Sequence, residues 1–400
     1  MELTAKQYEG LKTAVDRYKL GERYTCIAGF AGTGKSTLIQ FIIAALDMSP
    51  REVAYIAYTG KAANVLKNKG CPNAITAHKF LYKAIALPNG KFRYMPIIPD
   101  YNIKLVVVDE VSMLPKKMWD LLLSHPHYHV IASGDPGQLS PIPSEKGEEV
   151  NNHVLDNPHV FLDQVMRQAQ ESEIIRLSMH VREGKTIKSF QCENKDVMIF
   201  PKKELDTGKL MWADQILCAT NKTRTCINNQ VRKFLNYDNE LQIGDKVINL
   251  HNEWDILSNH NTPLTNGIIG KVTEFVTYTM PFGTKRMQGV PDSVNVYTGT
   301  ITGDEEGEEF TGLTWDKQEL DTGTSALTPP QEFKLRRGKY LVPLHFSYAY
   351  AMTVWKAQGS EFSKVLLIEE PYWPKNTQER IKFLYTGITR ASEKLVVITT

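Results

Sequence analysis

Continuous apolar runs alternate with helix-like segments over residues 24–135. The strand-like runs lie at 24–28, 53–58, 104–108 and 128–133. Helix-like patterns of apolar positions follow the first two runs, at 35–46 and 60–70. Continuous apolar strands separated by helices are typical of a parallel sheet that is covered on both faces. The pattern therefore predicts an α/β core over residues 1–150.

The same alternation begins again after about residue 150 and is interrupted once. Between residues 243 and 343 the segments are strand-like and rich in glycine, and helix-like patterns are scarce. We therefore expect a second α/β core formed by residues 151–242 and 344–400. Residues 243–343 are expected to form a small β insert within it.

A hairpin signal interrupts the first core. Asn89 and Gly90 stand between two strand-like runs. Asn-Gly is favoured in two-residue hairpin turns because both positions need a positive φ. The sequence thus predicts a small β-hairpin insert over about residues 82–101.

Composition restricts the functional classes only loosely. The 400 residues carry a formal net charge of +2, which permits a nucleic-acid partner but does not argue for one. Since no apolar run approaches the roughly 20 residues of a membrane span, we expect no membrane partner. The five cysteines include no Cys-x-x-Cys pair, which favours reduced thiols and a cytoplasmic protein.

Residues 29–36, "GFAGTGKS", carry the first candidate chemistry. They fit Gly-x-x-x-x-Gly-Lys-Ser between a predicted strand and a predicted helix, which is the context of a phosphate-binding loop. Lys35 would reach the β- and γ-phosphates of a nucleotide, and Ser36 would hold Mg²⁺. The expected nucleotide-binding residues of this loop are Gly29, Gly32, Thr33, Gly34, Lys35, Ser36 and Thr37.

Acidic residues follow the third apolar run. Asp109 is expected at the carboxyl end of its strand, where ligands bind in such sheets, and suits the magnesium site. Glu110 beside it can polarise a water for attack on the γ-phosphate. Gln138, in "SGDPGQLSPI", can donate to that phosphate or orient the water; a solvated loop glutamine is the alternative.

The order of motifs along nearly the whole chain resembles the superfamily 1 helicases of the RecD/Dda type, which move 5′ to 3′ on single-stranded DNA. The motifs are "LTAKQ" (3–7), "AYTGKAANVL" (57–66), "TAHKF" (76–80), "DEVSM" (109–113), "GDPGQLSPI" (134–142), "VMRQ" (165–168), "AMTVWKAQGSEF" (351–362) and "LYTGITRA" (384–391).

The resemblance implies a fold of two RecA-like P-loop cores, an ATP-driven DNA helicase activity, and ATP and Mg²⁺ as cofactors. Its partners would be single-stranded DNA and duplex junctions, with replication or recombination proteins, and the chain would be a monomer. A short chain with compact inserts suggests a viral or bacterial accessory enzyme. The pathway is left open among replication, recombination and repair.

Three residues take nucleotide roles through the resemblance. Gln7 looks like the glutamine that reads adenine, since its amide can pair with a donor and an acceptor on the base edge. Arg167 and Arg390 resemble the two arginines that the second core points at the γ-phosphate, where they would act as arginine fingers.

The resemblance also implies a path for the DNA strand. Hydroxyl, amide and lysine side chains suit phosphate contacts, and the matched ones are Thr59, Lys61, Thr76, His78, Thr353, Lys356, Gln358 and Ser360. His78 fits a structural histidine equally well. Trp355 stands where family members commonly have histidine, and it would either stack a base or pack internally.

The two inserts take expected roles as well. The first matches the position of the family's strand-splitting pin, so Phe92 or Tyr94 would face the separating base pair, unless this is an ordinary surface hairpin. The second resembles the family's SH3-like β domain. The alternatives to a helicase are a translocase that displaces proteins from single strands and a nucleotide-gated DNA-binding loader with incidental hydrolysis.

Overall fold

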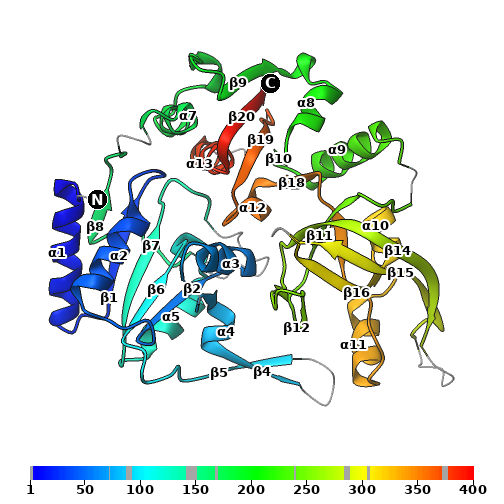
Figure 1. The fold of residues 1–400 in the computed structure, drawn as a ribbon, viewed down its shortest axis with the longest axis horizontal. Coiled ribbons are helices and arrows are strands. Elements are labelled where there is room, and N and C mark those ends of the chain that lie inside the picture. The colour runs from blue at the N-terminus through cyan, green and yellow to red at the C-terminus, as the bar shows by residue number, and fades with distance from the viewer. Residues whose placement is uncertain are drawn as a thin grey trace. The chain divides into compact units, whose positions relative to one another are not determined.

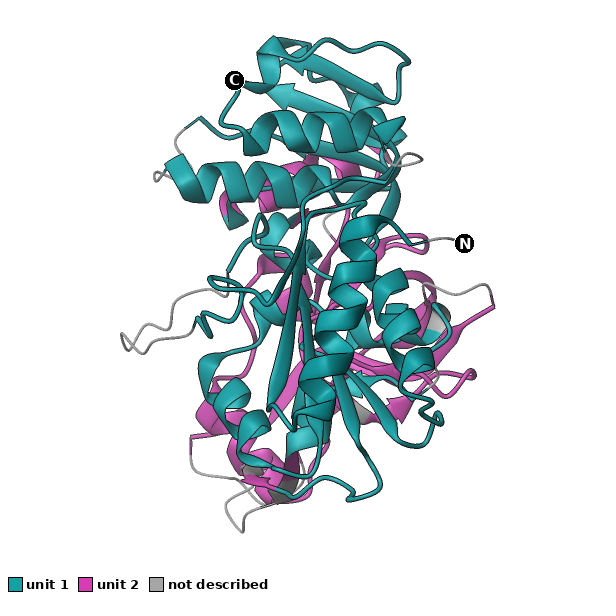
Figure 2. Ribbon diagram, turned by 90° about the vertical axis from the view of Figure 1, so that its left-hand side faces the viewer, with its two compact units in different colours: residues 1–81, 97–221, 353–400 teal, residues 82–96, 222–352 magenta. Residues whose placement is uncertain are grey.

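The chain divides into two units, each built from separate segments of sequence (Figure 2). The first unit comprises residues 1–81, 97–221 and 353–400, and the second comprises residues 82–96 and 222–352. The computed structural model describes residues 3–71, 73–86, 92–140, 151–166, 170–237, 240–282, 289–303, 307–371 and 377–400.

Six parallel strands form the first sheet of the first unit, in the order β3-β2-β6-β7-β1-β8 (Figure 1). The strands are β1 (Tyr24–Gly29), β2 (Val53–Ala57), β3 (Ile75–Thr76), β6 (Leu105–Val108), β7 (His129–Gly134) and β8 (Val160–Leu162). All residues of β6 and β7 are buried. A strand covered on both faces needs this continuous apolar sequence.

Helices cover this sheet and place its loops. They are α1 (Ala5–Lys19), α2 (Lys35–Ala45), α3 (Gly60–Asn68), α4 (Ala77–Leu81), the 3₁₀ turn η1 (Val111–Met113) and α5 (Lys116–Ser124). Helices α1 and α2 pack against each other. Ala14 of α1 and Leu38 of α2 share one buried core with Ile27, Val107 and Ile131 of the strands.

A second sheet in the same unit has the order β18-β10-β19-β20-β9. Its strands are β9 (Val197–Pro201), β10 (Gln215–Cys218), β18 (Ala351–Thr353), β19 (Phe362–Ile368) and β20 (Ala391–Thr399), and β10, β19, β20 and β9 pair in parallel. The accompanying helices are α7 (Glu173–Arg182), η2 (Ile187–Ser189), η3 (Lys202–Glu204), α8 (Thr207–Trp212), α12 (Val354–Ala357) and α13 (Thr377–Ile388). The two parallel sheets confirm the predicted α/β class.

The second unit contains an antiparallel five-stranded sheet of order β16-β15-β14-β11-β17. Its elements are α9 (Asn221–Phe234), β11 (Lys246–Asn249), β12 (Glu253–Leu257), β13 (Pro263–Leu264), β14 (Ile269–Pro281), β15 (Ser293–Thr302), β16 (Glu309–Asp316), α10 (Lys317–Thr322), α11 (Pro329–Arg337) and β17 (Phe346–Tyr348). Tyr297, Phe310, Trp315 and Phe346 are fully buried in its core.

An antiparallel pair also occurs where the Asn-Gly signal predicts a hairpin. Strand β4 (Tyr82–Ala86) pairs with β5 (Phe92–Pro96), from Tyr82 opposite Pro96 to Ala86 opposite Phe92. Asn89 and Gly90 themselves lie outside the described residues. Among the helices that are described, none combines the length and the apolar character needed to cross a bilayer.

A buried histidine ties two helices to the sheet of the second unit. His345 is only 5% exposed. Its Nδ1 lies 2.7 Å from Oε2 of Glu319 in α10, and its Nε2 lies 3.3 Å from Oε1 of Glu332 in α11. Burial alone would lower the pKa of His345, but the two carboxylates raise it to about 10. The imidazolium is therefore the form that these contacts stabilise.

This pairing predicts a pH-dependent stability of the second unit. Because the folded-state pKa of His345 exceeds its unfolded value of about 6.5, the stabilisation is fully present below that value and is lost as pH rises towards about 10. Over this interval the free energy of unfolding of the wild type should fall by more than about 1 kcal/mol relative to that of His345→Gln, as measured by thermal unfolding. The exposed His260→Gln is the matched control and should lose stability as the wild type does; if His345→Gln loses stability as steeply as the wild type, the expectation is wrong.

Candidate functional site

The loop between β1 and α2 has the backbone of a phosphate cradle. Gly32 and Gly34 have φ values of 74° and 80°, a left-handed conformation that favours glycine. A Cβ on Gly34 would also lie 2.4 Å from Nε2 of Gln7. Gly34 caps α2 without a side-chain hydrogen bond, so the first N–H groups of the helix have no side-chain acceptor at that position. Such a helix start favours an anion.

Lys35 lies against this loop. Its ammonium donates to the carbonyl oxygens of Gly29 (2.7 Å) and Phe30 (3.1 Å). The hydroxyl of Thr33 also donates to the Phe30 carbonyl, at 2.8 Å. These bonds fix the loop and keep a positive charge beside the N–H groups of the cradle, as the motif predicts.

Two carboxylates follow the end of β6. Burial, and then the neighbouring charge of Glu110, raise the pKa of Asp109 to about 6, while Lys35 opposes the shift. Glu110 has a φ of 50° and begins the turn η1. Few non-glycine residues adopt this conformation, and those that do cluster at functional sites. The backbone thus turns sharply where the two carboxylates stand.

The donors present at this edge fit Mg²⁺. The Asp109 carboxylate, whose pKa is raised, would be easier to ionise beside a cation. Ser36 is exposed in the first turn of α2 and offers a hydroxyl. In the part of the chain that the structure describes, no group of three or more His, Cys, Asp or Glu could hold a metal. Asp109 and Ser36 would therefore share the ion with nucleotide phosphates, as is usual for Mg²⁺.

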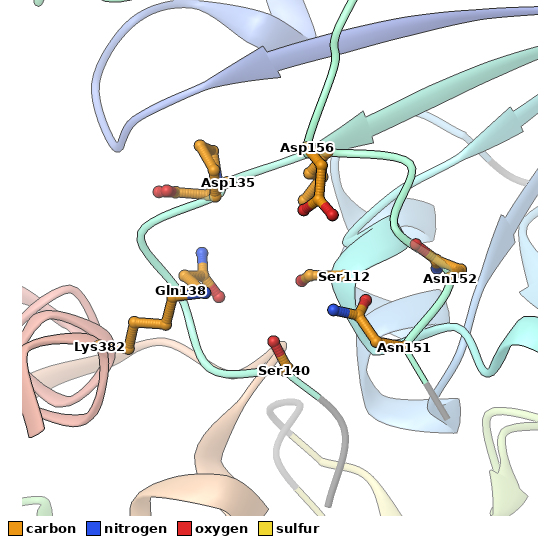
Figure 3. A pocket seen from close by; sticks show the side chains of 10 residues that line it. Ser112, Asp135, Gln138, Ser140, Asn151, Asn152, Asp156 and Lys382 are labelled. Atoms are coloured by element: carbon orange, nitrogen blue, oxygen red, sulfur yellow. The ribbon is translucent and has the colours of Figure 1, made fainter. Parts of the chain in front are cut away.

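Gln138 connects this edge to the loop after β7. Its Nε2 donates to Oε1 of Glu110 at 3.4 Å, and its own Oε1 is buried without a partner among the described residues. The side chain is 6% exposed, so the alternative of a solvated loop glutamine does not describe it. Figure 3 shows Gln138 around a pocket with Ser112, Asp135, Ser140, Asn151, Asn152, Asp156 and Lys382.

A tyrosine from the second core bonds to both loops of the first core. The hydroxyl of Tyr385, on α13, accepts from the N–H of Ala31 (2.9 Å) and donates to Oδ2 of Asp135 (2.6 Å). The N–H of Leu139 donates to the hydroxyl of Thr386 at 3.0 Å, and Nε2 of Gln358 donates to the Leu139 carbonyl at 2.9 Å. Tyr385 lies inside the motif "LYTGITRA", but nothing in the motif itself assigns this residue a role.

Gln7 has internal partners for both ends of its amide. Its Oε1 accepts from the N–H of Thr4 (3.0 Å), which completes a capping box at the start of α1. Its Nε2 donates to the carbonyl of Thr33 at 3.3 Å and contacts Sδ of Met166. The structure thus gives Gln7 a role in holding the cradle, and adenine reading stays a prediction.

The arginine fingers also stay predictions. Arg167 lies outside the described residues. The guanidinium of Arg390 donates to the carbonyls of Thr386 (3.1 Å) and Ser360 (3.1 Å) and to the hydroxyl of Thr389 (3.2 Å). These bonds hold the side chain of Arg390 against its own core.

The residues expected along the DNA path lie on segments that meet. Nζ of Lys61, on α3, lies 4.9 Å from the ring centroid of Phe362, on β19. A Cβ on Gly359 would lie 2.9 Å from Cβ of Ala62. Segments 57–66 and 351–362, far apart in sequence, therefore lie side by side in the first unit.

Within these segments several expected side chains serve the fold. The hydroxyls of Thr59 and Thr76 accept backbone N–H groups three residues ahead, at 3.2 Å each. Thr76, Thr353, Gln358 and Ser360 are buried, whereas Lys356 is exposed. Their DNA contacts stay predictions.

The structure describes the side chains of His78 and Trp355, for which the sequence leaves both a DNA contact and a structural role open. Burial lowers the pKa of His78, whose ring lies 5.8 Å from that of Tyr58. The Trp355 ring lies 5.6 Å from the buried ring of Phe383 on α13, which supports internal packing. The side chains of Phe92 and Tyr94 lie outside the described residues.

Two family models match the chain. Residues 2–199 match the AAA domain model, and residues 348–398 match the UvrD-like helicase C-terminal domain. The chain is 26% identical over 396 residues to the ATP-dependent RecD2 DNA helicase of Deinococcus radiodurans, and the match covers 94% of this chain and 46% of that protein. It is 23% identical over 266 residues to the ATP-dependent DNA helicase dda of Enterobacteria phage T4, covering 62% of this chain and 61% of the phage protein. The chain thus spans less than two thirds of either relative.

Solved Pif1 helicases share the fold. The Candida albicans structure superposes with a TM-score of 0.54 at 18% identity, covering 100% of this chain and 94% of that one. The Bacteroides structure in complex with ADP-AlF3 and single-stranded DNA gives a TM-score of 0.53 at 17% identity, covering 99% and 92%.

Two parallel sheets with a phosphate cradle on the first define a P-loop protein with two RecA-like cores. The matches to the RecD2 and dda helicases confirm the resemblance of the motifs to the superfamily 1 helicases of the RecD/Dda type. The SH3-like character of the β insert and the predicted domain boundaries stay predictions.

The hydrogen bonds of Tyr385 predict a specific stability effect. Tyr385→Phe removes a donor from the buried Asp135 carboxylate and an acceptor from the Ala31 N–H. We expect a loss of about 1–3 kcal/mol in the free energy of unfolding, because a buried charged partner is left unsatisfied. Denaturant unfolding of the variant measures this loss.

The matched control is Tyr128→Phe. The Tyr128 hydroxyl is buried and donates only to the neutral carbonyl of Leu122 at 2.9 Å among its described contacts. Its loss should cost about 0.5–1.5 kcal/mol. Equal losses in the two variants would contradict the importance of the Tyr385 bridge.

Proposed function

We propose that this chain is an ATP-dependent DNA helicase that moves 5′ to 3′ along single-stranded DNA and separates duplex DNA. The observation that carries the proposal is the set of bonds from α13 to both loops of the first core, through Tyr385 and Thr386. A P-loop protein whose second core contacts the cradle directly can change that contact with nucleotide state. The names of the relatives, which are DNA helicases, support the same reading.

In the proposed reaction the cradle residues 29–37 bind the phosphates of ATP. Ser36 and Asp109 would hold Mg²⁺, which would neutralise phosphate charge. Glu110 takes the proton of the attacking water, and Gln138, bonded to Glu110 at 3.4 Å, orients that water. Lys35 stabilises the charge that develops on the phosphates, and Arg167 and Arg390 complete the site from the second core when it closes.

In the proposed translocation, nucleotide binding and release shift the second core against the first. Gln358 belongs to the segment expected on the DNA path and also bonds to the Leu139 carbonyl, next to Gln138. The loop 135–140 therefore lies between the nucleotide edge and the strand-path segments. This continuity is the physical basis on which a step at the phosphates would move Thr59, Lys61, Thr353 and Lys356 along single-stranded DNA.

The hydrolysis assignment predicts the behaviour of two variants. Lys35→Ala removes the cation of the cradle and Glu110→Gln removes the base, so each should lower single-stranded-DNA-stimulated ATP turnover by at least about 100-fold. Steady-state phosphate release measures the effect. Exposed Lys12→Ala and Glu9→Gln are the matched controls. Normal turnover in either site variant, or no stimulation of the wild type by single-stranded DNA, would refute the assignment.

The direction of movement predicts which duplex is unwound. A duplex with a 5′ single-stranded tail should be separated, and the same duplex with a 3′ tail should not. Strand displacement read by fluorescence, with ATP and Mg²⁺, distinguishes them. A preference for the 3′ tail would overturn the direction, and movement on single strands without separation of either duplex would favour the translocase alternative.

A further inference from the structure

Arg182, an arginine of the second core other than Arg167 and Arg390, lies at the cradle. The matched motifs do not include it. Arg182 is the last residue of α7. Its guanidinium carbon lies 3.4 Å from the ring centroid of Phe30, the second residue of the cradle "GFAGTGKS". A guanidinium over an aromatic face at this distance is a cation–π contact. Arg182 is therefore placed by a residue of the phosphate loop itself.

The ring that positions Arg182 is held in turn. The carbonyl of Phe30 accepts hydrogen bonds from Lys35 and Thr33, at 3.1 and 2.8 Å. Its ring packs edge-on against Phe161, with centroids 5.3 Å apart. Because the loop and the ring are both fixed, the guanidinium has a defined position relative to the cradle.

Arg182 has a donor to spare. Its Nη1 is buried and has no hydrogen-bond partner in the described chain. Arg176, on the same helix, donates through Nη1 to Glu193 at 2.8 Å, although its Nε is likewise unpaired among the described residues, and Arg380 donates to Glu369 at 2.6 Å. A buried, unpaired donor on a charged group is costly and is a sign of a ligand.

The position favours the terminal phosphate of a nucleotide. Burial raises the pKa of Tyr385 and the charge of Arg182 is among the contributions that oppose this rise; the same charge also acts on Asp163 and Glu183. The hydroxyl in turn bonds to Ala31 of the cradle and to Asp135. This is the side of the cradle on which Glu110 and Gln138 lie, since Gln138 follows Asp135 in the same loop and bonds to Glu110.

We propose that Arg182 binds an oxygen of the γ-phosphate of the nucleotide held by residues 29–37. The inference rests on the proposed function, because it takes a nucleoside triphosphate as the ligand. A guanidinium suits this contact, since its fork of N–H donors matches phosphate oxygens. Arg390, by comparison, already donates to two carbonyls and a hydroxyl of its own core.

The test measures nucleotide affinity without DNA, using fluorescent ADP and a fluorescent non-hydrolysable ATP analogue. Arg182→Ala should weaken binding of the ATP analogue by about tenfold or more and binding of ADP by less than about threefold. Arg182→Lys keeps the charge without the fork and should fall between the alanine variant and the wild type. Arg176→Ala, on the same helix, should leave both affinities unchanged.

A purely structural role would give a different result. If Arg182 only packs on Phe30, then Arg182→Ala and Phe30→Leu should each weaken the binding of both nucleotides equally. Equal losses for the two nucleotides in Arg182→Ala would overturn the proposal, as would unchanged affinities in that variant. Thermal unfolding of each variant shows whether it is folded, and Arg182→Lys retains the test if the alanine variant is not.

The affinity measurement, together with the strand-displacement assay, separates this inference from the proposed function. A wild type that binds neither nucleotide would refute the nucleotide site and the Arg182 contact together. A wild type that binds the ATP analogue but fails to unwind DNA would refute the helicase function and leave the Arg182 contact standing, since the affinities are measured without DNA.

Discussion

The hydrogen bonds of the Tyr385 hydroxyl join the two cores of the first unit at the nucleotide edge. One oxygen accepts from a cradle N–H and donates to a buried carboxylate. Asp135 depends on this donor, because burial raises its pKa and the Tyr385 hydrogen bond and Lys35 oppose the shift. The N–H of Ala31 also has the Tyr385 hydroxyl as its acceptor, whereas the N–H groups of a phosphate loop usually point at an anion. The cradle, the loop after β7 and α13 therefore share one contact.

Charge balance explains why so many strong contacts gather at this edge. Asp135 is buried and Asp109 is half-buried; both have raised pKa values, and Lys35 acts against both shifts. Burial of unpaired charge is costly. The proposed ligand, a nucleotide with a cation, would bring positive charge to these carboxylates and so reduce this cost.

Much of this architecture follows from the sequence. The apolar runs predict the buried strands because a strand covered on both faces must be apolar throughout, and "GFAGTGKS" predicts the cradle because Gly32 and Gly34 need positive φ. The contacts of Tyr385 and Arg182 are different. They join residues more than 150 positions apart, and their side chains carry no local signal that distinguishes a bridge from ordinary packing. Gln7 shows the same limit, because its capping box is readable from Thr4 and Gln7 but its bond to Thr33 is not.

The polar residues of the matched motifs show how fold and proposed function share side chains. Thr59 and Thr76 cap backbone N–H groups, and Gln358 binds the loop that carries Gln138. A side chain held in this way has little rotamer freedom left to lose, so a contact with a DNA phosphate would order it at small further cost. The same bonds connect any displacement at Gln358 to Leu139 and from there to Gln138 and Glu110. If the segment that carries Gln358 contacts the strand as proposed, it can respond to a change at Glu110 by moving with its core, without being mobile itself.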